Sequence, residues 1–122
     1  MIRPQELRIG NYISDLDGKI IKVEELTICA SYITKKRINN LPFDYYKPIP
    51  LTEEILLKLG FKQNEQFKTN FKFYLKEDEI DINIYNGKNN SWLNDRYIIN
   101  LKYVHQLQNL FFSLCGEELT FK

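Results

Sequence analysis

An alternating pattern between residues 67 and 85 constrains the fold more than any other feature of the chain. Apolar residues recur at every second position in each arm of this segment: Phe71, Phe73 and Leu75, preceded by Phe67, and then Ile80, Ile82 and Ile84. Because successive side chains of a strand point to opposite faces, the pattern predicts an antiparallel hairpin with one apolar face. We predict that Leu75 pairs with Ile80, Phe73 with Ile82 and Phe71 with Ile84, with residues 76–79 as the connection.

The opposite face of this hairpin carries Lys68, Lys72 and Lys76. The same register sets Lys76 against Glu79 and places Asp81 diagonal to two of the lysines. We therefore expect this face to be largely neutralised.

Two segments have the marks of helices. LTEEILLKLGF offers Thr52 as an N-terminal cap, Gly60 as the left-handed residue at the end, and an i,i+4 pair of Glu54 with Lys58. KYVHQLQNLFFSLCGEEL predicts a longer helix over 103–115, ended by Gly116, with Val104, Leu107 and Phe111 on its core face.

The remaining elements follow from turn and strand residues. Residues 8–34 predict a strand-rich N-terminal half with a tight turn at Asp17-Gly18, and this opening is similar to the start of small SH3-like barrels. The proline-containing stretch 35–50 and NGKNNS (86–91) predict irregular structure, and RYIINL (96–101) predicts another strand. The fold class predicted is α+β, with residues 1–122 as a single domain and the C-terminal helix packed on the sheet.

The charge balance argues against a dedicated phosphate-binding protein. Lysine and arginine total 17 against 16 acidic residues, a formal charge of +1, whereas each phosphate contact needs a cation. The cysteines, Cys29 and Cys115, form no CxxC motif and are read as reduced. The chain has no run of 18 apolar residues and its first residues are charged, so we expect a soluble cytoplasmic protein with no membrane partner.

No catalytic or metal-binding motif stands out. His105 is the only histidine, nothing near it resembles a nucleophile motif, and we interpret it as a surface or capping residue. One histidine and two scattered cysteines are too few for a zinc site. We therefore predict no enzyme activity, no metal and no cofactor.

Phe112 departs from the amphipathic pattern of the C-terminal helix. It falls on the polar side with His105, Gln108 and Asn109, opposite the leucines. Another segment of the chain could cover it, it could simply be exposed, or it could contact a partner, because aromatic residues among amides are typical of interface anchors. These four residues are the predicted partner-binding site.

A basic and aromatic stretch supports a different site. Lys35, Lys36 and Arg37 precede Tyr45 and Tyr46, and such mixtures bind single-stranded nucleic acid by stacking and phosphate contacts. The alternative interpretation is a solvated loop beside half-buried tyrosines.

Two strings resemble a known family. PIPLTEEILLKLGF (48–61) and KYVHQLQNLFFSLCGEEL (102–119), with the opening LRIGNYI and DGKIIKV, are similar to signatures of a family of small uncharacterised proteins of bacteria, prophages and phages. The resemblance transfers no catalytic residue. It implies an accessory protein of a mobile element, a class that includes inhibitors of host defence such as anti-CRISPR proteins.

The leading functional prediction is a non-enzymatic binding protein that acts on a macromolecular partner: a host or phage protein, or a ribonucleoprotein. A phage or mobile-element inhibitor of a host defence system is the specific form that the resemblance implies. A nucleic-acid-binding module and a small-ligand sponge are the alternatives. The protein itself is expected to be a monomer or a small homo-oligomer.

Overall fold

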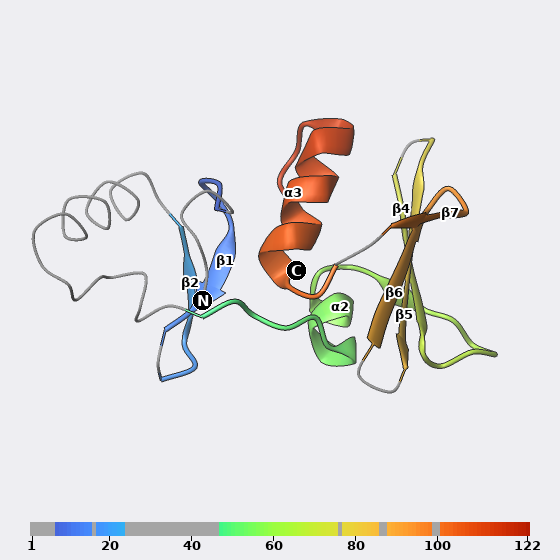
Figure 1. Cartoon of the computed structure of the whole chain (residues 1–122), viewed down its shortest axis with the longest axis horizontal. Coiled ribbons are helices and arrows are strands. Elements are labelled where there is room, and N and C mark those ends of the chain that lie inside the picture. The colour runs from blue at the N-terminus through green and yellow to red at the C-terminus, as the bar shows by residue number, and fades with distance from the viewer. Residues whose placement is uncertain (1–6, 16, 24–46, 76, 86–87, 99–100) are drawn as a thin grey trace, which may run out of the picture. The chain divides into compact units, whose positions relative to one another are not determined.

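The computed structural model describes residues 7–15, 17–23, 47–75, 77–85, 88–98 and 101–122, which group into two compact units. Unit 1 comprises Met1–Ile49 and Tyr103–Leu110, and unit 2 comprises Pro50–Lys102 and Phe111–Lys122. Helices and antiparallel strands are both present (Figure 1), so the α+β class is confirmed. The single domain predicted for residues 1–122 stays a prediction.

Unit 1 contains a short antiparallel hairpin of β1 (Tyr12–Ser14) and β2 (Ile20–Lys22). Its turn uses Gly18, whose φ of 84° is costly for other residues, so the predicted turn at Asp17-Gly18 is confirmed. Ile13 and Val23 are fully buried and form the hydrophobic core at this hairpin. The strands predicted after residue 23 and most of the irregular stretch 35–50 lie outside the described residues.

Unit 2 begins with helix α2 (Glu53–Lys58), whose two ends follow the sequence prediction. The Oγ1 atom of Thr52 accepts a hydrogen bond of 3.2 Å from the amide of Ile55. At the other end Gly60 has a φ of 99°, which lets the amide of Phe61 donate back to the carbonyl of Leu56 at 3.0 Å. The predicted ion pair is also present, with 3.3 Å between Lys58 Nζ and Glu54 Oε1.

A five-stranded antiparallel sheet follows, with its strands in chain order. Figure 1 labels β4, β5, β6 and β7 of this sheet. Its strands are β3 (Lys62–Gln63), β4 (Asn70–Tyr74), β5 (Glu79–Tyr85), β6 (Lys88–Leu93) and β7 (Arg96–Ile98). The strand predicted in RYIINL is confirmed by β7. The loop predicted for NGKNNS is wrong, because its residues from Lys88 onward belong to β6. Asn94 and Asp95, with φ of 50° and 67°, make the tight turn that returns the chain as β7.

The predicted register of the β4–β5 hairpin is wrong by two residues. Phe73 lies opposite Ile80 and Phe71 opposite Ile82, and the four-residue connection is 75–78. A shift of two residues keeps every side chain on its predicted face, so alternation alone does not separate the two registers. The observed register sets Lys72 directly opposite Asp81, where the predicted one would have set it opposite Asn83.

The C-terminal helix α3 spans Val104–Cys115 and ends at Gly116, which has a φ of 74°. In unit 2, the ring of Phe111 packs edge-on against Phe73 of β4 at 5.3 Å, and the ring of Phe61 lies 5.2 Å from Phe73. The predicted packing of the C-terminal helix on the sheet is therefore confirmed. In unit 1, Val104 and Leu107 are fully buried. Neither described helix is long and apolar enough to cross a membrane.

Candidate functional site

The polar side of α3, predicted from the sequence to meet a partner, is largely buried. His105 is 2% exposed and Gln108 is fully buried, so the expectation of a surface histidine is wrong. The ring of His105 stacks on Tyr103 with an interplanar angle of 8° and 5.9 Å between centroids.

Hydrogen bonds within unit 1 explain why α3 carries amides here. The Oε1 atom of Gln108 accepts from the amide of Tyr12 at 2.8 Å, and its Nε2 atom donates to the carbonyl of Gly10 at 3.1 Å. The Oδ1 atom of Asn109 accepts from Asn11 at 3.0 Å and from the guanidinium of Arg8 at 3.1 Å. These side chains satisfy backbone and side-chain groups beside β1, which buried polar groups require.

Phe112, in unit 2, is 40% exposed. Phe112 is therefore not a core residue, and its side chain is not fully exposed to solvent either. Its role in partner binding stays a prediction, as does that of Asn109. The alternative nucleic-acid site, Lys35, Lys36, Arg37, Tyr45 and Tyr46, lies outside the described residues.

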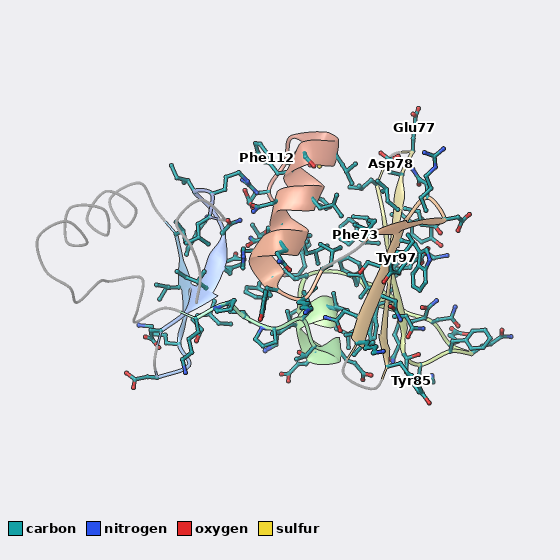
Figure 2. The ribbon with its side chains drawn as sticks, in the orientation of Figure 1. Phe73, Glu77, Asp78, Tyr85, Tyr97 and Phe112 are labelled. Atoms are coloured by element: carbon teal, nitrogen blue, oxygen red, sulfur yellow. The ribbon has the colours of Figure 1, made fainter. Side chains whose placement is uncertain are left out.

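The five-stranded sheet of unit 2 presents a different surface rich in aromatic and amide groups. We call it the outer sheet face. Strand alternation and register place the following side chains on it, away from Phe71 and Ile82: Lys62, Asn70, Lys72, Tyr74, Glu79, Asp81, Asn83, Tyr85, Lys88, Asn90, Trp92 and Tyr97. Three of its tyrosines are more than half exposed: Tyr74 at 62%, Tyr85 at 62% and Tyr97 at 57%. Figure 2 labels Tyr85 and Tyr97 on the sheet.

Cross-strand contacts hold several of these side chains in place. Trp92 and Tyr97 are paired across β6 and β7, with their rings edge-on at 5.9 Å. The hydroxyl of Tyr97 donates to Asn90 Oδ1 at 3.3 Å, and Asn83 donates to Asn70 at 3.2 Å. The outer sheet face is therefore a partly preorganised surface and not a set of freely rotating side chains.

A charged cluster lies within this face. Lys72 Nζ is 3.0 Å from Glu79 Oε1 and 3.6 Å from Asp81 Oδ1. The hydrogen bond between Lys72 and Glu79 raises the pKa of the lysine and lowers that of the glutamate. Burial raises the pKa of Asp81, and the nearby lysine only partly opposes this effect. The face therefore pairs Lys72 with both acids. Lys76, which the predicted register set against Glu79, lies outside the described residues.

Carboxylate oxygens of Glu79, Asp81 and Asp95 lie within 4.8 Å of one another, a spacing that could hold a metal ion. Lys72 already supplies a positive charge to two of the three. A metal ion would have to compete with that ammonium group, so the arrangement favours an internal ion-pair network.

The sequence identified the part of the outer sheet face on the β4–β5 hairpin, but its continuation onto β6 was missed because the β6 sequence is typical of a loop. Its polar residues (KNNSWL) lack the apolar alternation that marked β4 and β5. The sequence feature that indicates a hairpin here is Asn94-Asp95, between Trp92 and Tyr97. Both residues tolerate the left-handed conformations of a tight turn. Comparison of the chain with protein-family models, with curated proteins and with solved structures finds no match.

Proposed function

We propose that this chain is a binding protein that recognises the surface of a partner protein through the outer sheet face. The observation that carries the proposal is that three exposed tyrosines share this face with Trp92, which packs against Tyr97, and with a row of asparagines on paired strands. Tyrosine and tryptophan bring a large contact area at a low cost in side-chain entropy, and asparagine adds adaptable hydrogen bonds. Recognition surfaces of antibodies have a similar make-up.

The charges of this face favour a protein partner over a nucleic-acid backbone. The face carries three lysines, Lys62, Lys72 and Lys88, against Glu79 and Asp81, with Asp95 beside these acids. Lys72 is already paired with both Glu79 and Asp81, so the described residues leave no large excess of cations. A phosphate backbone would need an excess of cations at the contact. The resemblance noted in the sequence supports a narrower form of the proposal, in which the partner is a component of a host defence system.

The test compares three immobilised proteins in one capture experiment from host lysate, with and without nuclease. They are the wild type, a variant with Tyr85→Ser and Tyr97→Ser, and a control with Phe67→Ser, which removes an aromatic ring that is 65% exposed outside this face. Captured proteins are identified by mass spectrometry, and the affinity of the purified partner is then measured for all three.

We expect one protein to be retained by the wild type and the control, and its affinity to fall at least tenfold in the tyrosine variant, because aromatic anchors carry much of an interface's binding energy. Retention that nuclease abolishes would favour the nucleic-acid module instead. Equal affinity for all three proteins would refute the assignment to this face. Expression in a host with an intact defence system, scored by phage plating, tests the narrower form.

A further inference from the structure

A second surface of unit 2 is a groove between the β4–β5 hairpin and the segment that ends α3. Its cavity volume is about 530 Å³, within the range of about 300–1,000 Å³ found for ligand-binding sites. Leu75, Glu77 and Asp78, from the connection between β4 and β5, line one wall, and the end of α3 with the chain that follows it supplies the other. Figure 2 labels Phe73 on β4 and Glu77 and Asp78 at the hairpin connection.

The floor of the groove is apolar and fixed. Phe111 and Leu119 are 6% and 1% exposed, and Leu75 and Leu114 are half-buried. The edge-on contact of Phe73 with Phe111 holds the rings beneath the groove. Such a floor can accept a large apolar side chain without first rearranging, so little of the binding energy is lost to ordering the site.

The rim is strongly acidic. Glu77 and Asp78 stand on one side and Glu117 and Glu118 on the other, and among the described residues that line the groove Lys122 is the single basic one. The whole chain has a formal charge of +1, so this excess of negative charge is local. The groove therefore combines an apolar floor with a negative rim.

We propose that the groove docks a basic and apolar segment of a partner polypeptide, in which one or two large apolar side chains are flanked by lysine or arginine. The apolar side chains fill the floor over Leu114 and Leu119, and the basic residues lie against the acidic rim. Charge complementarity selects this occupant, because opposite potentials speed association and like charges exclude acidic segments. The inference does not rest on the outer sheet face.

The first test uses fluorescence anisotropy with short fluorescein-labelled peptides and the full chain. One probe carries two leucines flanked by lysines, a second replaces the lysines with glutamates, and a third replaces the leucines with serines. We expect the first probe to bind at least tenfold more tightly than either control, and its affinity to fall as salt is raised. Equal binding of the acidic probe, or no binding of the basic apolar probe at millimolar protein, would overturn the proposal.

The second test places the binding in the groove. A variant with Glu77→Lys and Glu117→Lys reverses two exposed rim charges, and Glu65→Lys makes the same type of change at an exposed residue of unit 2 that does not line the groove. We expect the rim variant to lose at least tenfold in affinity and the Glu65 variant to match the wild type. Equal losses in both variants would refute docking in the groove.

A third measurement uses the unmodified protein and needs no variant. Cys115 is exposed and lines the groove, so a bound probe should slow its alkylation. Peptide mapping reads its modification separately from that of Cys29. Saturating basic apolar probe should protect Cys115 several-fold, whereas an unchanged alkylation rate would contradict the proposed position.

Discussion

Replacement of Gln108 by leucine tests whether the buried amide joins α3 to the hairpin of unit 1. The side chain is fully buried and makes bonds of 2.8 Å with the amide of Tyr12 and 3.1 Å with the carbonyl of Gly10. Leucine fills much of the same space but can make neither bond. The variant therefore isolates the hydrogen bonds from the packing.

The expected loss follows from these two bonds. Each contributes about 1 kcal/mol net, and a buried backbone group that loses its partner costs about 1–3 kcal/mol. Leucine recovers part of this lost stability because it buries apolar surface. We expect the free energy of unfolding to fall by roughly 2–4 kcal/mol, a large part of the roughly 5–15 kcal/mol typical of a folded protein.

Thermal unfolding followed by circular dichroism measures this loss, and amide exchange at β1 locates it. For a chain of 122 residues, each kcal/mol lowers the melting temperature by about 4 °C. Gln66→Leu, at an exposed position, is the matched control and should change stability by less than about 0.5 kcal/mol. A loss below about 1 kcal/mol for Gln108→Leu, or unchanged exchange at the amide of Tyr12, would refute the reasoning.

Three further predictions follow from unit 2. Gly60→Ala should destabilise the fold by about 1–2 kcal/mol in denaturant titration, because the residue has a φ of 99° and a new Cβ would lie 3.2 Å from the ring of Phe73; an unchanged midpoint would contradict this. Asp81→Asn should gain stability relative to the wild type as the pH rises. Burial raises the folded-state pKa of Asp81 above its ordinary value of 3.8. The contribution of Asp81 to the free energy of unfolding is therefore present below that value and is lost as the pH rises through the raised pKa. Urea melts from about pH 3 to 7 in which the stability of the variant relative to the wild type stays flat or falls would exclude the effect. Phe112→Ala should cost about 2 kcal/mol because its ring is 40% exposed, against roughly 3–5 kcal/mol for Phe111→Ala at 6% exposure; thermal melts that reverse this order would show that burial does not set the cost.

Interactions between near neighbours in the chain were predictable. The cap by Thr52, the left-handed Gly60 and Gly116, and the turn at Gly18 all depend on a few consecutive residues. Their geometry follows from backbone sterics and local hydrogen bonds, which depend on the types of these few residues and can be inferred from the sequence. The faces of β4 and β5 were predictable for the same reason, because alternation is a local property.

The pairing of distant residues was decided only by the tertiary structure. Two registers of the β4–β5 hairpin place apolar opposite apolar, and the chain adopts the one that sets Lys72 against Asp81. The strand β6 becomes visible only once β5 and β7 flank it. In both cases the contacts that fix the strand pairing join residues on different strands, and the pattern within one strand does not show which residues pair.

The polar side of α3 shows most clearly that burial cannot be predicted from a local sequence pattern. An amide that faces water and an amide that satisfies a buried backbone group have the same place in a helical pattern, so Gln108 looked like a surface residue. Which of the two it is depends on whether another segment brings backbone groups to it, and the hairpin of unit 1 does so through Tyr12 and Gly10. The sequence alone determined that α3 has a polar side, and the fold decided that much of this side is interior, because burial is a property of what packs against a residue and not of the residue itself.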